Sequence, residues 1–102
     1  MHTIRLLDSI DFQNLRLSED VSKFYLYVEN EAVGLFQESL GSVAGLDSLH
    51  GYDGGRSISI LEMALNHLNA LDKTAEVSAT ATVIGQMLAY AKQYPYCFWF
   101  ID

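Results

Sequence analysis

His50, Tyr52 and Asp53 form the one close grouping of residues in this sequence that resembles a chemical site. They lie in residues 49–55, a run that includes three glycines. A histidine and an aspartate three positions apart can bind a metal ion or transfer protons. A zinc site needs three or four ligands, however, and no second His or Cys lies nearby in the sequence. We therefore expect no metal and no cofactor here, and predict a surface turn that contacts a protein partner.

Two other kinds of chemistry fit this segment poorly. Ser48 lacks the Gly-x-Ser-x-Gly context that positions the nucleophile of many hydrolases. Residues 51–57 resemble a phosphate-binding loop ahead of a helix, but they match neither common glycine-rich pattern, and the neighbouring carboxylates would repel phosphate. We therefore expect that the protein is not an enzyme.

A window without basic residues surrounds this segment. Between Lys23 and Arg56 the chain carries a charge of −5. The acidic residues of the window are Glu29, Glu31, Glu38, Asp47 and Asp53. A surface of one sign attracts a partner of the opposite sign, so the window predicts a basic partner.

Two tyrosines precede these acids on a predicted strand. Residues 23–28 alternate, with apolar residues on one face and Tyr25 and Tyr27 on the other. The pattern leaves open whether a helix covers these two tyrosines or whether they are exposed. If they are exposed, they and Tyr52 would supply contact area, because tyrosine is enriched where interfaces bind most strongly. The predicted partner-binding surface therefore contains the three tyrosines, His50 and the five acids.

Composition and charge limit the class of protein. The chain of 102 residues has the size of one domain and half of its residues are hydrophobic, so we expect a single folded domain over 1–102. A net charge of −7 disfavours nucleic acid and anionic membrane surfaces as partners. The longest apolar run, 97–101, is far shorter than the roughly 20 residues of a membrane-spanning helix. The start of the chain has no export-signal pattern and Cys97 is the single cysteine, so we expect a cytoplasmic protein with a buried thiol.

Periodicity predicts the elements that must position the surface. Residues 2–7 alternate as a strand does, and residues 96–101 form a strand that is apolar on both faces, which is typical of a central strand. A capping box that starts at Ser59 predicts a helix near 58–71, and a second helix is expected near 76–94. About three strands and two late helices predict a layered domain of the α+β (or α/β) class.

Two segments are ambiguous. Residues 31–44 have helical spacing, which we favour, but a strand over 33–37 is the alternative. Residues 75–83 alternate as a strand does, yet their apolar positions also continue a helical stripe, and alanine is a poor strand residue. We predict helix for the second segment, with a strand followed by a helix from about residue 83 as the alternative.

The whole profile resembles the small acidic immunity proteins of bacteria that neutralise nuclease toxins, in particular those of contact-dependent growth inhibition systems. Residues 77–101 are also similar to the closing helix and strand of barstar, the barnase inhibitor. In both, a helical stripe runs into an Ala-Lys pair, here Ala91 and Lys92, and a short apolar strand follows. The acidic recognition helix of barstar has no clear counterpart here, so no residue role is carried over. The resemblance implies an acidic surface that occludes the basic cleft of a toxin and speeds their encounter.

We therefore predict an inhibitory binding protein that blocks a basic, nuclease-like toxin domain. One alternative is a phage-encoded mimic of nucleic-acid charge that blocks a host defence enzyme. Another is a small ligand- or metal-binding domain that uses residues 50–53, and a fourth is a subunit of a larger assembly. The sequence leaves the partner's identity and the oligomeric state open.

Overall fold

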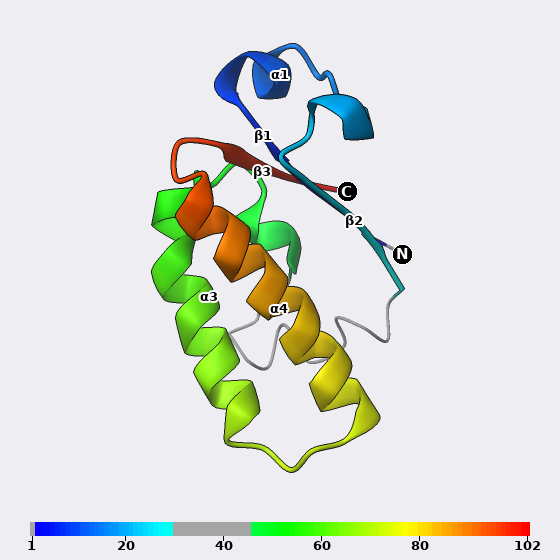
Figure 1. The fold of residues 1–102 in the computed structure, drawn as a ribbon, viewed down its shortest axis with the longest axis vertical. Helices are drawn as coiled ribbons and strands as arrows, with labels where there is room; N and C mark the ends of the chain where they lie inside the picture. The colour runs from blue at the N-terminus through cyan, green and yellow to red at the C-terminus, as the bar shows by residue number, and fades with distance from the viewer. Residues whose placement is uncertain (1, 30–45) are drawn as a thin grey trace.

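In the residues that the computed structural model describes, 2–29 and 46–102, a three-stranded antiparallel sheet packs against two long helices (Figure 1). In chain order the elements are β1 (His2–Leu7), α1 (Ser9–Gln13), the 3₁₀ turn η1 (Glu19–Val21), β2 (Phe24–Val28), the 3₁₀ turn η3 (Leu46–Leu49), α3 (Gly54–Asn69), α4 (Ala75–Gln93) and β3 (Phe98–Ile101). The predicted layered domain is confirmed. Its antiparallel strand pairing makes it α+β rather than α/β.

The C-terminal strand is hydrogen-bonded along both edges. Within the described sheet the strand order is β2-β1-β3, so β1 is the middle strand. The other edge of β3 pairs with the segment that precedes α3. Two backbone hydrogen bonds make this pairing, Gly51 N–H to Trp99 O and Trp99 N–H to Tyr52 O. The bond from Gly54 N–H, at the start of α3, to Cys97 O, just before β3, continues it. The C-terminal strand is therefore central in the sense that it is paired on both sides, although the segment on its outer side is not a regular strand.

One face of the sheet carries the hydrophobic core. Ile4 and Leu6 of β1 and Trp99 of β3 are fully buried in one cluster with residues of α3 and α4. The two helices supply buried apolar residues at helical spacing, among them Leu61, Ala64 and Leu68 of α3 and Val77, Ile84 and Leu88 of α4. Figure 1 shows α3 and α4 together on this side of the sheet and α1 on the other.

Both long helices form where the sequence predicted them, but one boundary was wrong. α4 begins after the N-cap Thr74, whose hydroxyl accepts a hydrogen bond from the Val77 N–H at 3.1 Å. The favoured helix over 75–83 is therefore confirmed, and the strand alternative is wrong. α3 begins at Gly54 with Asp53 as its N-cap, well before the capping box expected at Ser59.

Close packing explains why α3 starts with a glycine at position 54. A Cβ atom at Gly54 would lie 2.6 Å from the Tyr94 carbonyl oxygen, a distance that real Cβ contacts do not show. Glycine therefore lets the start of α3 touch the end of α4. The N–H groups of Gly54 and Gly55 donate to Cys97 O and Pro95 O, so the turn after α4 caps α3. These contacts offset the low helix propensity of glycine, which had favoured a loop here.

A buried hydrogen-bond chain joins β3 to α3. The Trp99 Nε1–H donates to Ser57 Oγ at 2.9 Å, and the Ser57 hydroxyl donates to Gly54 O at 2.8 Å. Both side chains are fully buried. Because a buried N–H without an acceptor is costly, Ser57 is what allows the Trp99 indole to lie in the centre of the core.

Further sequence predictions concern single segments. The buried thiol predicted at Cys97 is confirmed, and its burial raises the pKa of that thiol, which keeps it protonated. The ambiguous segment 31–44 lies outside the described residues. No helix within the described ranges is long and apolar enough to cross a membrane.

We expect Gly54→Ala to destabilise the protein, because the added methyl group would push α3 away from α4. The free energy of unfolding should fall by about 2 kcal/mol, the usual size of an overpacking defect. Gly85→Ala is the matched control, since its added Cβ would have no atom within 4 Å beyond its chain neighbours and the backbone of α4 itself. That control should raise stability by roughly 0.5–1 kcal/mol. Urea unfolding measures both changes, and a Gly54→Ala protein as stable as wild type would contradict the close approach.

Ser57→Ala should lower the free energy of unfolding by about 1–3 kcal/mol, because it leaves the Trp99 N–H buried without an acceptor. The same substitution in a Trp99→Phe background should cost much less, since phenylalanine has no N–H. Urea unfolding of the four proteins gives the coupling energy as a thermodynamic cycle. Equal costs in the two backgrounds would show that this hydrogen bond does not stabilise the fold.

Candidate protein-binding face

The face of the sheet opposite the long helices carries two of the residues that were predicted to contact a partner, Tyr25 and Tyr27. We define this outer face by the strand residues that alternate away from the core: Thr3, Arg5, Leu7, Tyr25, Tyr27, Phe98 and Phe100. In β2, Phe24 and Val28 are buried, whereas Tyr25 and Tyr27 are 37% and 53% exposed. The question that the sequence left open is thereby answered, because α3 and α4 do not cover these two tyrosines.

A row of four side chains crosses the outer face from β2 to the turn before α3. The Arg5 guanidinium lies 5.3 Å from the centroid of the Tyr25 ring and 5.8 Å from that of the Phe100 ring. The Phe100 ring packs edge-on against the His50 ring, with centroids 4.7 Å apart. The row Tyr25–Arg5–Phe100–His50 therefore joins β2 to the turn at residues 50–53, two regions that the sequence analysis assigned to the same surface.

Arg5 is the central residue of this row, and it is not among the residues predicted from the sequence. Its side chain is only 12% exposed. Its Nε donates to Leu17 O at 2.8 Å, and its Nη1 lies 3.3 Å from Asp102 Oδ1 in an ion pair. A signal was present in the sequence, because an arginine between the buried positions Ile4 and Leu6 of an alternating strand must lie on the non-core face.

α1 covers the end of the outer face nearest to the turn. The ring of Phe12 packs against Phe98 and Phe100, with centroid distances of 5.5 and 6.0 Å. It also lies 5.7 Å from the His50 ring. The part of the outer face that α1 leaves open is therefore the β2 side, where Tyr25 and Tyr27 lie.

The turn residues themselves are engaged by the fold. His50 Nδ1 accepts a hydrogen bond from the Ile101 N–H at 3.1 Å. Tyr52 packs against the core instead of the outer face, and the Arg56 guanidinium lies 4.0 Å from its ring centroid. Asp53 is the N-cap residue of α3, where a negative charge favours the helix dipole. The structure thus separates Tyr52 from the exposed tyrosines, because neighbouring residues of an extended segment point to opposite sides.

The predicted acids fall only partly within the described residues. Glu29 directly follows β2 and is exposed. Glu31 and Glu38 lie outside the described residues, and so does the side chain of Asp47, whose backbone belongs to η3. Of the five predicted acids, the structure therefore describes the side chains of Glu29 and Asp53.

The backbone N–H groups that a phosphate would need at the glycine-rich turn are already hydrogen-bonded within the protein. The N–H groups of Gly54 and Gly55, which begin α3, already donate to carbonyl oxygens of the turn at residues 94–97. Across the described part of the chain, no three His, Cys, Asp or Glu side chains gather closely enough to hold a metal ion. The glycines of this turn therefore serve helix packing and strand pairing.

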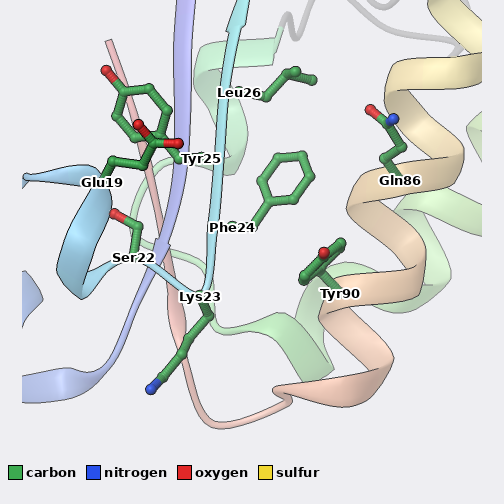
Figure 2. Close-up of a pocket in the computed structure, with 8 residues that line it drawn as sticks. All are labelled: Glu19, Ser22, Lys23, Phe24, Tyr25, Leu26, Gln86 and Tyr90. Atoms are coloured by element: carbon green, nitrogen blue, oxygen red, sulfur yellow. The ribbon is translucent and has the colours of Figure 1, made fainter.

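A groove lies between β2 and α4 (Figure 2). It encloses about 380 Å³ and is lined by Glu19, Ser22, Lys23, Phe24, Tyr25, Leu26, Gln86 and Tyr90. Figure 2 shows Phe24 and Leu26 turned toward α4, and Tyr25 turned to the opposite side of the strand. The rings of Phe24 and Tyr90 pack with centroids 4.9 Å apart. No pattern in the sequence predicts this groove, because its walls lie on elements that are distant in the chain.

Comparison with protein-family models, with curated proteins and with solved structures finds no match for this chain. The resemblance to bacterial immunity proteins is not tested by these comparisons and stays a prediction. Function is therefore inferred from the charge and geometry of the described surface.

The short helix that carries Phe12 should loosen in acid. The N-cap residue of α1, Asp8, accepts a hydrogen bond at Oδ1 from the Asp11 N–H at 2.9 Å, and this bond holds the pKa of Asp8 below its ordinary value. A carboxyl group whose pKa is lowered by folding stabilises the fold above its unfolded pKa, and that contribution is lost as pH falls through the folded pKa. Stability should therefore decline below about pH 4.

Asp8→Asn provides the test, because asparagine can cap the helix but does not ionise. The free energy of unfolding of this variant, measured with urea over roughly pH 2–6, should depend less steeply on pH than that of the wild type. Identical pH profiles for the two proteins would contradict the role of the Asp8 carboxylate.

Proposed function

We propose that this protein is an inhibitor that binds a basic protein domain and covers its functional surface, as immunity proteins do with nuclease toxins. It acts in the cytoplasm by binding alone and catalyses no reaction. The observation that carries the proposal is the row Tyr25–Arg5–Phe100–His50, which places mutually packed, partly exposed rings on the outer face of an acidic chain.

The two tyrosines of β2 suit the centre of an interface. Tyr25 and Tyr27 are exposed, yet they are carried by a paired strand, and Arg5 packs on the Tyr25 ring. Side chains that are ordered before binding lose less conformational entropy when the partner arrives. Tyrosine also combines a large apolar area with a hydroxyl group that tolerates water at the edge of a contact.

The charge of the chain supports a basic partner. A net charge of −7 raises the association rate of a basic domain and repels nucleic acid, and Glu29 lies at the end of the strand that carries both tyrosines. Because salt screens such attraction, the association rate should fall as ionic strength rises. An acidic protein with an exposed aromatic face is therefore well suited to cover a nucleic-acid-binding cleft.

The alternatives have less support. A ligand or metal site at residues 50–53 would need His50, but the Nδ1 of His50 already accepts the Ile101 N–H. A mimic of nucleic-acid charge needs carboxylates spaced along an extended surface. The outer face instead has an arginine between two aromatic rings at its centre.

The test is capture of the partner followed by an activity assay. The immobilised full-length chain is incubated with lysate of the organism that carries the gene, and the captured protein is identified and produced. We expect a basic protein whose nuclease activity is abolished by one equivalent of the chain. The double substitution Tyr25→Ala and Tyr27→Ala should weaken binding at least about 100-fold, since hot-spot tyrosines are commonly worth 2 kcal/mol or more.

Tyr96→Ala is the matched control, because Tyr96 is 88% exposed in the turn before β3 and is not part of the outer face. It should leave both binding and inhibition unchanged. A captured protein whose activity is untouched by the chain would overturn the inhibitor function. A partner that binds the double variant as tightly as wild type would show that another surface makes the contact.

A further inference from the structure

We propose that Leu15 and Ile10, two exposed aliphatic residues on the segment that crosses the outer face, form an apolar contact that enters a hollow on the surface of the basic partner. The proposal rests on the proposed function for the basic character of the partner. It adds a second contact element beside the two tyrosines of β2, and it states what the partner must present there: an apolar hollow with basic residues at its rim.

Leu15 holds a backbone conformation that leucine rarely adopts. Its φ is 54°, and among the described residues it is the one non-glycine residue with a positive φ. α1 ends in a Schellman arrangement, in which the Leu15 N–H donates to Phe12 O at 3.3 Å and the Arg16 N–H donates to Asp11 O at 2.9 Å. Glycine usually takes this place, because a Cβ atom is unfavourable at positive φ. Leucine at this position therefore lowers the stability of the fold.

Burial does not offset that loss. Leu15 is 66% exposed, and so is Ile10 in α1. Phe12, which lies between them in the sequence, instead packs against Phe98 and Phe100 of β3. The segment is therefore attached to the sheet through Phe12, while its two aliphatic residues stay in solvent. A strained residue whose side chain adds little to the core is a candidate for a contact that forms only on binding, when its apolar surface leaves water.

The same segment is joined to the exposed tyrosines. Leu17 O accepts the hydrogen bond of 2.8 Å from Arg5 Nε, and the Arg5 guanidinium lies 5.3 Å from the centroid of the Tyr25 ring. Leu15 precedes Leu17 by two residues, so their Cα atoms are at most about 7 Å apart. A partner that covers Tyr25 and Tyr27 would therefore reach Leu15 by extending across Arg5, without leaving this side of the sheet.

The charge of the segment favours a basic occupant over a second copy of the chain. Residues 8–20 contain four acids and one base, a charge of −3. The base, Arg16, lies 3.5 Å from the carboxylate of Asp11, whereas Glu19 and Asp20 in η1 are exposed. Lysine or arginine side chains at the rim of the hollow would pair with these two exposed carboxylates. Two copies of the chain would instead bring two net charges of −7 together.

Leu15→Gly separates binding from folding, because its two expected effects have opposite signs. Glycine relieves the unfavourable backbone conformation, so the folding equilibrium constant, measured by urea unfolding, should rise about fivefold. The same substitution removes the apolar side chain from the proposed contact, so binding should become weaker. A loss of binding caused by damage to the fold would come with lower stability instead.

Random twelve-residue peptides displayed on phage and selected against the folded full-length chain provide a probe that does not need the natural partner. We expect the selected peptides to combine Lys or Arg with aromatic or aliphatic residues. A selected synthetic peptide should bind Leu15→Gly at least about tenfold more weakly than wild type, as measured by calorimetry, because a leucine side chain is lost from the contact. Ile10→Ala should weaken binding in the same direction.

Met63→Ala is the matched control, because Met63 is also apolar and 62% exposed but belongs to α3, on the other side of the sheet. It should change peptide binding less than twofold. Equal loss of binding in this control would show that the peptides respond to exposed apolar surface in general, and would overturn the proposal.

Other results would also overturn it. They are a Leu15→Gly protein no more stable than wild type, equal peptide binding by Leu15→Gly and wild type, failure to select any peptide, and selected peptides without basic residues. A dimer of the free chain that Leu15→Gly dissociates, detected by light scattering, would assign the contact to a second copy. The peptide selection does not use the natural partner, so its failure is distinguishable from failure of the inhibitor function, which the capture assay decides.

Discussion

The start of α3 has to fit between the end of α4 and the outer edge of β3, and the other contacts of the molecule are arranged around that fit. The first N–H groups of α3 bind carbonyl oxygens of the turn that leads from α4 into β3, and a side chain at Gly54 would collide with Tyr94 O. This junction brings Ser57 to the Trp99 indole and so fixes the centre of the core. It also holds the turn at residues 50–53 against β3. His50, Tyr52 and Asp53, which resemble a chemical site in the sequence, therefore make structural contacts.

The outer face is ordered by a different interaction. Arg5 is nearly buried, and a cation in that position must be paired to be tolerated. A carbonyl oxygen, a carboxylate and two aromatic rings satisfy it, and these contacts hold Tyr25 in place without a covering helix. The face can therefore be rigid and accessible at the same time, a combination that favours binding a protein surface.

Apolar patterns in the sequence were sufficient to find the three strands and α3, whereas α4 also needed the low strand propensity of alanine, because residues 75–83 fit both a strand and a helical period. The start of α3 was misplaced because a contact with α4, far along the chain, outweighs the local preference of glycine for loops. His50 and Tyr52 were grouped by their closeness in sequence, but the extended backbone between them turns Tyr52 toward the core. The place of Arg5 in the row and the groove beside Tyr90 depend on strand order and helix packing, which no local pattern encodes.

The pairing of Thr3 with Asp102 has a consequence for how the chain folds. Among the described elements β1 is synthesised first and β3 last. The middle strand of the sheet therefore has only one of its two neighbouring strands until β3 has been synthesised. Until then Ile4 and Leu6 have no Trp99 to pack against, and the two long helices have no finished sheet to cover. Contacts between residues so distant in sequence are slow to form, although the entropy of closing such a loop grows only with the logarithm of its length. We therefore expect the core to close only after β3 has been made, because Trp99 of that strand is fully buried in the core cluster.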